Sequence, residues 1–395
     1  MNPFHSRVPH PRLLFLLLGG LSAFAPLSID MYLPSIPQIA RAFSVPHSEI
    51  ELSLASFFIG MSLGQLLYGT TIDRFGRKRP LYLGLVVYCL SSLVCATAAN
   101  ASVLIAARFL QALGACAGLV VSRAMVRDMF DYRESAQVLS MLMLVSGTAP
   151  IVAPVIGGYI ARFLGWQAVF YVLTGIGVLC LLAVAARLPE TRAPNPAVRL
   201  RSTLGIYWRI LRERHFSGFM LAGGIAHAGL FGYITGSPFV FMHVYAVPVD
   251  RFGWIFSLNA LGYIASSQFN RRLLRRFSPD RIMHAGQLLL AVSGFALILC
   301  AAIDLGFWGI LIPLFCYIAS LGISTPNAIA AALSKHGSHA GAASALVGTI
   351  QFMLGATTSA LVSHLNNGTP MTMAAVVGGC GIIGFCLFKL LVDRP

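Results

Sequence analysis

Two charged side chains lie inside long apolar stretches of this sequence. Of the 13 acidic residues, only Asp30 falls well inside such a stretch, and of the 28 basic residues, only Arg108 does. A charge at the centre of a membrane-spanning helix costs about 2.5–3.5 kcal/mol or more, so both residues are functional candidates. An apolar cavity favours the protonated form of a carboxylate, and a nearby arginine opposes this. Such a site could exchange a proton for a substrate.

The spacing places Asp30 and Arg108 at the same depth. Asp30 lies about five residues before the end of its apolar run, and Arg108 about six residues after the start of its own. At about 1.5 Å per residue, both are roughly 8–9 Å below one surface. Equal depth permits an ion pair between Asp30 and Arg108. A static, purely structural ion pair is the alternative interpretation.

The elements that must position these residues are membrane-spanning helices. The chain is 57% hydrophobic and only 10% charged, against about 25% charged residues in average globular chains. At about 20 residues per span, apolar runs predict twelve helices, at 13–35, 50–71, 81–99, 102–123, 136–160, 166–187, 216–244, 252–270, 282–303, 306–333, 341–364 and 371–392. We therefore predict an all-α integral membrane protein.

The basic residues indicate the orientation of the chain. With both termini on one side, 24 of the 28 basic residues fall on that side and 3 on the other. The positive-inside rule then places both termini of a multi-pass protein in the cytoplasm. We expect the protein to lie in the inner membrane of a bacterial cell. The net charge of +15 is thus a topology signal, and we expect no nucleic-acid partner. The first run continues beyond Ala23-Phe24-Ala25, which favours a retained helix over a cleaved signal peptide.

The chain divides into two halves around a polar stretch. Shifting the sequence by 202 residues places Val45-Pro46 on Val247-Pro248 and Arg74-Phe75 on Arg276-Phe277. Parallel six-helix repeats are a transporter architecture, with the substrate between the halves. We predict an N-terminal six-helix bundle over 1–187, a cytoplasmic linker loop over 188–215 and a C-terminal bundle over 216–395.

The loop after the second run combines charges with glycines. It contains Gly69, Asp73, Arg74, Gly76 and Arg77. Membrane anchoring explains the basic residues, but it requires neither the acidic residue nor the glycines. Asp128 follows the fourth run on the same side and could pair with this loop. Such charges could tie helix ends together in one state and separate in another.

Other motifs favour packing over chemistry. Gly60-Met-Ser-Leu-Gly64 matches a hydrolase nucleophile elbow, but it lies within a helical run, where the motif has no strand-to-helix turn. His227 could relay protons, although a packed histidine is the simpler interpretation. None of the three lysines follows a glycine, so no Walker A motif is present. We expect no enzymatic activity, no cofactor and no metal.

Proline and glycine interrupt the fifth run. Pro150, Pro154, Gly157 and Gly158 fall within it. Helix breaks are tolerated in a membrane where neighbouring helices or a cavity satisfy the freed backbone groups. A simple kink is the alternative.

Several of these segments resemble signatures of one family. Gly69-x3-Asp73-Arg74-x-Gly76-Arg77-Lys78 resembles the loop 2–3 motif of the major facilitator superfamily. The segments that resemble motifs of its drug:proton antiporters are Asp30-Met-Tyr-Leu-Pro34, Arg108-x-x-Gln111-Ala-x-Gly114 and Ala149-Pro150…Ala153-Pro154-x-x-Gly157-Gly158. Ala153 departs from the glycine often found there. With Gly236-Ser-Pro-Phe239, the chain resembles the bicyclomycin and chloramphenicol resistance branch.

The resemblance implies a monomeric rocker-switch exporter that exchanges small amphipathic compounds for protons. Asp30 would bind the proton, Arg108 would tune it, and Asp73, Arg77 and Asp128 would form an inner latch. The candidate substrate-binding residues are Asp30, Tyr32, Arg108, Gln111 and Phe231. A carrier of a small metabolite, such as a nucleoside, sugar or amino acid, is the alternative within this class, because fold does not fix the ligand. A channel or receptor is a further alternative.

Overall fold

The apolar runs of the sequence fold into long helices. A computed structural model describes residues 11–130, 132–194, 200–335 and 340–392. Its elements are α1 (Pro11–Asp30), η1 (Leu33–Ser35), α2 (Ile36–Phe43), α3 (His47–Phe75), α4 (Lys78–Ala96), α5 (Ala101–Met129), α6 (Tyr132–Leu164), α7 (Trp166–Arg187), α8 (Leu200–Arg212), α9 (Arg214–Pro238), η2 (Phe239–Val244), α10 (Val249–Leu273), α11 (Pro279–Ala302), α12 (Gly306–Leu333), α13 (Ala340–His364) and α14 (Met371–Leu391). The predicted all-α membrane fold is confirmed.

Each predicted run corresponds to one long helix. Within the described ranges, eleven helical segments are long and apolar enough to cross a membrane. The remaining run, 252–270, is the eighth along the chain and forms α10, which is outside that set. Three polar residues in this run, Asn259, Gln268 and Asn270, reduce its hydropathy.

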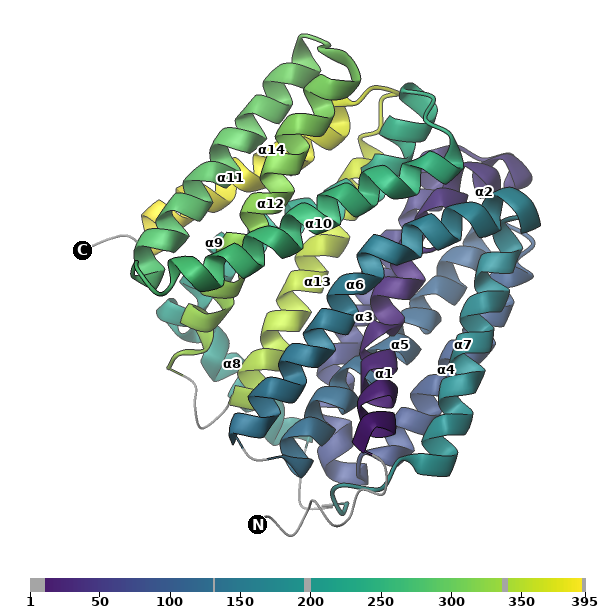
Figure 1. Ribbon diagram of the computed structural model, residues 1–395, viewed down its shortest axis with the longest axis vertical. Coiled ribbons are helices and arrows are strands. Elements are labelled where there is room, and N and C mark those ends of the chain that lie inside the picture. The colour runs from purple at the N-terminus through teal and green to yellow at the C-terminus, as the bar shows by residue number, and fades with distance from the viewer. Residues whose placement is uncertain (1–10, 131, 195–199, 336–339, 393–395) are drawn as a thin grey trace.

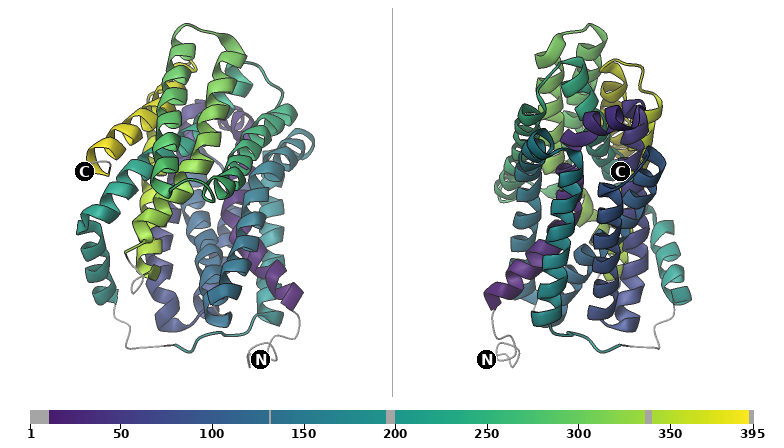
Figure 2. Two further views of the ribbon diagram at one scale, coloured as in Figure 1. Left: turned by 60° about the vertical axis from the view of Figure 1, so that its left-hand side comes forward. Right: turned by 90° about the vertical axis from the view of Figure 1, so that its right-hand side faces the viewer.

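The helices form two bundles that lie side by side (Figure 1). Helices α1 to α7 make the first bundle, coloured purple to teal, and α9 to α14 make the second, coloured green to yellow. Two helix pairs make the most extensive contacts between the bundles, because α3 packs against α13 and α6 packs against α10. The further views in Figure 2 show the second bundle displaced along the long axis of the molecule relative to the first, so that its green helices reach further at the top of the view. We call the end of the first bundle where α3 meets α4 the Arg77 end, and the opposite end, where α6 meets α7, the Arg162 end.

The first membrane helix ends at Asp30. Hydrogen bonds from the backbone N–H groups of Met31 and Tyr32 to the carbonyl groups of Leu27 and Ile29 complete its last turn. A short 3₁₀ turn and α2 follow, with Pro34 and Pro37 at positions where a missing N–H does not break a helical bond. Asp30 therefore lies where the chain changes direction inside the protein, close to the Arg162 end.

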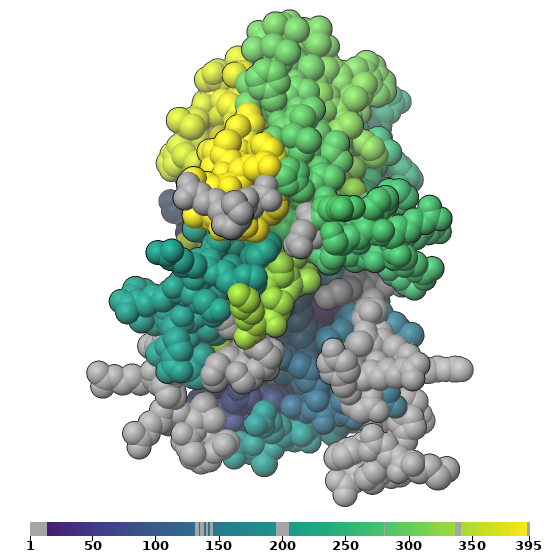
Figure 3. All heavy atoms as spheres, turned by 90° about the vertical axis from the view of Figure 1, so that its left-hand side faces the viewer, coloured from purple at the N-terminus to yellow at the C-terminus, as the bar shows by residue number. Residues whose placement is uncertain are grey.

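The predicted linker loop contains a helix. Residues 188–215 read as a loop from their polarity, but α8 occupies Leu200–Arg212. This helix buries Tyr207 and Ile210 against Phe216 and neighbouring residues of the second bundle, and it lies on the surface, in teal, in Figure 3. Its apolar residues form a single stripe, which a search for continuous apolar runs does not detect.

Candidate functional site

The charged cluster predicted in the α3–α4 turn forms around Arg77. This side chain is 3% exposed. Its guanidinium donates to Asp73 Oδ1 at 2.7 Å and to both carboxylate oxygens of Asp128, at 2.7 and 3.1 Å. Burial lowers the pKa of Arg77, but the hydrogen bonds and charges of Asp128 and Asp73 outweigh it and raise the pKa above its ordinary value. The arginine therefore stays charged and joins α3, α4 and α5.

Residues of the linker complete this cluster. Glu190 accepts hydrogen bonds from the backbone N–H groups of Arg77 and Lys78, at 2.7 and 3.0 Å. It thus caps the N-terminus of α4, where a negative charge is favourable. Thr191 donates to Asp128 at 3.1 Å, and Arg192 lies 3.5 Å from Asp73. Sequence reasoning missed these residues; the signal was an acidic residue next to Pro189, just after the sixth run.

The other residues of the predicted motif lie around the cluster. Gly76 has φ +82°, and a side chain there would also meet Glu190 Oε2 at 2.9 Å, so only glycine fits. Gly69 faces Tyr207 of α8 and Ala345 of α13, at 3.2 and 3.6 Å from an added Cβ. Arg74 lies outside the ion pairs and stacks on Phe75. The motif therefore combines a buried ion network with a close contact between the bundles.

Arg108 is enclosed inside the first bundle. It has no solvent exposure, and its guanidinium carbon lies 4.6 Å from the ring centre of Tyr32 and 4.3 Å from that of Phe57. Its Nη1 donates to the carbonyl oxygen of Ser28 at 2.9 Å and to the side chain of Gln111. Within the described ranges, Nε and Nη2 have no hydrogen-bond partner. Two aromatic faces and neutral oxygens thus surround the charge.

A polar chain extends from Arg108 through α4. Gln111 donates to the hydroxyl of Ser92 at 2.8 Å, and Ser92 donates to the carbonyl oxygen of Tyr88 at 2.7 Å. The hydroxyls of Tyr88 and Ser28 are 2.8 Å apart. This chain fixes the orientation of Gln111, so that its carbonyl oxygen faces the guanidinium.

Asp30 does not pair with Arg108, contrary to the predicted ion pair. Asp30 is 3% exposed, and among the described residues its carboxylate has neither a hydrogen-bond nor an ion-pair partner. It lies within electrostatic range of Tyr233 on α9, whose hydroxyl accepts a hydrogen bond from Asn259 of α10 at 3.1 Å. The expectation was wrong because depth along a helix does not specify which way the side chain faces. Asp30 instead borders the second bundle.

The predicted helix 5 motif is the packing surface of α6. Pro150 and Pro154 lie within α6 without ending it. A side chain at Gly157 would collide with the carbonyl oxygen of Met31, and one at Gly158 would approach the carbonyl oxygen of Val249 to 2.9 Å. These glycines therefore allow α6 to contact both the segment after Asp30 and the start of α10, which belongs to the other bundle.

Phe231 belongs to an aromatic cluster between the bundles. Its ring centre lies 4.7 Å from that of Phe58 on α3 and 5.6 Å from that of Phe352 on α13. The ring of His227 lies 5.7 Å from Phe231, and its Nδ1 is 3.1 Å from the hydroxyl of Thr325. The cluster therefore forms an apolar contact between α3 of the first bundle and α9 and α13 of the second.

A second buried carboxylate was missed by sequence reasoning. Glu51 on α3 has no solvent exposure, and within the described ranges neither carboxylate oxygen has a hydrogen-bond partner. The apolar run starts at residue 50, which made Glu51 look like the edge of a span. The helix itself begins at His47, so Glu51 lies in its second turn, against the other bundle.

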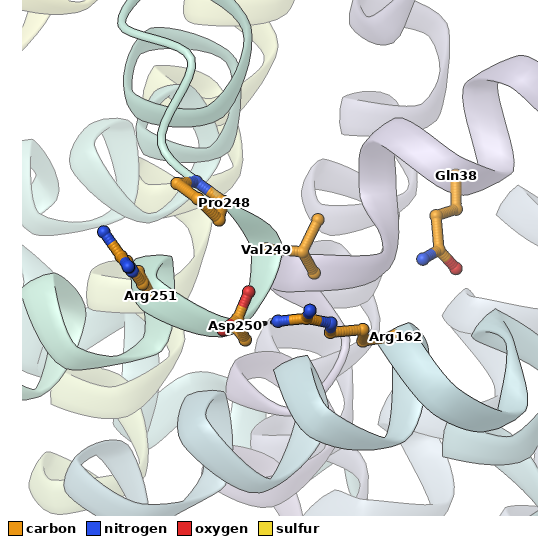
Figure 4. A pocket seen from close by; sticks show the side chains of 6 residues that line it. All are labelled: Gln38, Arg162, Pro248, Val249, Asp250 and Arg251. Atoms are coloured by element: carbon orange, nitrogen blue, oxygen red, sulfur yellow. Dashed lines mark ion pairs between the residues drawn. The ribbon is translucent and has the colours of Figure 1, made fainter.

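A pocket with a cavity volume of about 420 Å³ opens at the Arg162 end. Arg162 of α6 and Asp250 of α10 form an ion pair across the two bundles at 2.7 Å, and Figure 4 shows them facing each other below Val249. Gln38 of α2 also lines this pocket. The Arg162–Asp250 pair in this pocket is partly exposed and links the two bundles. The pocket is thus distinct from the sites of the buried Asp30 and Arg108.

Comparison with known proteins shows what the chain is similar to. Residues 18–360 match the family described as the Major Facilitator Superfamily. A bicyclomycin resistance protein homolog of Haemophilus influenzae is 34% identical over 96% of each chain. The multidrug resistance protein MdtL of Klebsiella pneumoniae is 29% identical over 96% of each chain. The xylose transporter XylE from E. coli superposes with a TM-score of 0.75 at 13% identity, over 96% of this chain and 97% of that one, which is a likeness of fold.

Proposed function

This chain belongs to the Major Facilitator Superfamily, and we propose that it is a proton-coupled drug exporter. It would exchange small amphipathic compounds for protons by alternating access, in which the bundles 1–187 and 216–395 rock about the linker 188–215. The proposal places the protein in the bacterial inner membrane as a monomer, with the Arg77 end in the cytoplasm. The names of the bicyclomycin and multidrug resistance relatives support a drug as the substrate.

The observation that carries the proposal is the isolation of Asp30. A buried carboxylate that lacks a cation or a hydrogen-bond donor is costly in its charged form. Such a group therefore favours the protonated, neutral form. Asp30 lies at the junction of α1 with the second bundle, within electrostatic range of Tyr233. Rocking of the bundles would change its access to water, which suits a group that takes up a proton in one state and releases it in another.

Arg108 and the aromatic cluster are assigned supporting roles. The two unpartnered nitrogens of Arg108 provide donors for a polar group of the substrate or for a carboxylate in another state. Tyr32 and Gln111 hold the guanidinium in place. Phe231, with Phe58 and Phe352, would contact the apolar part of the substrate.

The ion network around Arg77 is proposed to be the cytoplasmic latch. It links α3, α4 and α5 with the linker segment that leads to the second bundle. The Arg77 side chain is buried, and Asp73 and Asp128 hold its guanidinium in one geometry. We propose that the network stabilises the state in which the bundles are closed at this end.

The test is transport by the purified protein in proteoliposomes. With ethidium and bicyclomycin as probes, an imposed pH gradient should drive accumulation, and a protonophore should abolish it. Trans-stimulation by unlabelled probe should be present, because a carrier shows it and a channel does not. Accumulation that ignores the pH gradient would contradict proton coupling, and transport of sugars or nucleosides without either drug would favour the metabolite carrier.

A further inference from the structure

Glu51 is a buried acid that forms no ion pair with any cation in the described part of the chain. It lies in the second turn of α3, where α3 packs against α13 of the other bundle. It has no solvent exposure, and neither carboxylate oxygen has a hydrogen-bond partner in the described part of the chain. Asp73 and Asp128 differ from it, because both contact the guanidinium of Arg77.

The nearby hydroxyl groups are engaged elsewhere. Ser363 of α13 is the hydroxyl next to Glu51, but it donates its proton to the carbonyl oxygen of Ser359 at 3.0 Å. Tyr32 is within electrostatic range of Glu51, and its hydroxyl is paired with that of Ser53 at 2.8 Å. Because a serine hydroxyl has a single proton to donate, Ser363 would have to give up its bond to Ser359 in order to donate to a Glu51 carboxylate.

Charged and titratable groups at this end of the bundle do not compensate Glu51 either. On α3 and the elements packed against it they are His47 and Glu49 (α3), Tyr32 (before η1), Arg41 (α2), Cys95 (α4), Arg108 (α5), Tyr233 (α9), His243 (η2) and His364 (α13). None of these forms an ion pair with Glu51 among the described residues. Arg108, the buried cation of this set, stacks on Tyr32 and Phe57.

We propose that Glu51 is a second proton site of the transporter, in addition to Asp30. The carboxyl group is protonated while α3 and α13 are in contact, and it exchanges its proton with water when the bundles separate at the Arg162 end. This inference rests on the proposed proton-coupled transport. It adds one proton to the number that Asp30 alone would carry in each cycle.

The position of Glu51 distinguishes this role from a structural one. A neutral side chain of similar shape, such as glutamine, would fill the same space without the cost of burying an ionisable group. Motion of one bundle against the other changes the surroundings of Glu51 directly, because its neighbours Tyr32 and Ser363 belong to different bundles. Asp30 also borders the other bundle, through Tyr233, so both acids respond to the same movement.

Infrared difference spectroscopy of the purified protein tests protonation without any substrate. At neutral pH, an Asp30→Asn protein should keep the carbonyl stretch of a protonated carboxyl group, and an additional Glu51→Gln substitution should remove it. The matched control is Glu49→Gln, two residues earlier on the same helix, which should leave the band unchanged. Absence of the band in Asp30→Asn would overturn the proposal, whether or not the protein transports drugs.

The proton count per cycle tests the role in transport. With the membrane potential clamped at zero, the accumulation of bicyclomycin at zero net flux should be about tenfold lower per pH unit of gradient in Glu51→Gln than in the wild type. Glu49→Gln should match the wild type. Equal accumulation in Glu51→Gln and wild type would overturn the second proton site. If the wild type shows no response to pH, the proposed function fails and the infrared result alone decides the state of Glu51.

Discussion

Arg108 donates a hydrogen bond to the carbonyl oxygen of Ser28, at 2.9 Å, and none to the carboxylate of Asp30 two residues further along the chain. The cation and the acid therefore have separate surroundings. Arg108 is enclosed by Tyr32 and Phe57, whereas Asp30 faces α9. A proton can therefore leave or reach Asp30 without breaking an ion pair. Breaking such a pair in every cycle would slow transport.

Replacing Arg108 by lysine should impair transport although the charge is kept. A lysine has one compact ammonium group, which cannot cover both rings and also donate to Ser28 and Gln111 in the same geometry. The loss of one desolvated cation–π contact, about 2 kcal/mol, corresponds to a decrease in drug export of about tenfold or more. Transport by Arg108→Lys at the wild-type rate would show that the stacked geometry is unimportant. Its melting temperature serves as the control for folding.

Substitution of Gly157 by alanine should disturb the junction of α6 with the segment after Asp30. The added methyl group collides with the backbone carbonyl oxygen of Met31, and an overpacked site costs about 1–3 kcal/mol. We expect a lower melting temperature together with slower export. Gly175→Ala on α7 is the matched control, because an added Cβ there meets nothing within 4 Å. Identical behaviour of the two variants would argue against a tight α6 junction.

Removing one charge from the Arg77 network should slow turnover and leave drug binding nearly intact. Asp128→Asn keeps the shape of the side chain but removes the carboxylate that Arg77 contacts through two nitrogens, at a cost of about 1–3 kcal/mol. Asp73→Asn should act in the same direction with a smaller effect, since Asp73 is 39% exposed. Calorimetric titration with bicyclomycin and initial export rates separate the two quantities. A weaker Kd with unchanged turnover would assign the network to the binding site instead.

The ion pair at the opposite end should matter much less. Arg162 is 53% exposed, and an exposed ion pair contributes about 0.2–1 kcal/mol. Asp250→Asn and Arg162→Gln should therefore change export by less than about fivefold, and high salt should reduce the difference further. A loss as large as that of Asp128→Asn would show that this pair controls the cycle.

The spans and the Arg77 cluster could be predicted because their signals are local in the sequence. Long apolar runs predict helices directly, and a loop that mixes Asp73, Arg77 and two glycines is unusual for simple anchoring. The pairing with Asp128 followed from topology alone, because the ends of α3 and α5 lie on the same side. The contact with Glu190 did not, since nothing in a polar linker indicates which of its residues caps the distant N-terminus of α4.

The direction in which a buried side chain points from its helix could not be predicted. Each residue rotates the side chain by about 100° around a helix, so equal depth left the direction of Asp30 and Arg108 open. Glu51 was missed for a related reason, because α3 begins three residues before the apolar run and takes this acid into the bundle. Helix α8 was missed because its amphipathic stripe, which includes Tyr207 and Ile210, depends on a partner surface that the sequence does not show.

The central claim is that Asp30 carries the exchanged proton, and one comparison tests it directly. Wild-type and Asp30→Asn proteins in proteoliposomes are measured for bicyclomycin accumulation driven by a pH gradient, and for bicyclomycin counterflow without a gradient. Asp30→Asn should accumulate about tenfold less bicyclomycin per pH unit of gradient, or none at all if Asp30 is the sole proton carrier, and it should keep counterflow, because a permanently neutral side chain still allows the bundles to rock. Accumulation in Asp30→Asn with the pH dependence of the wild type would contradict the account.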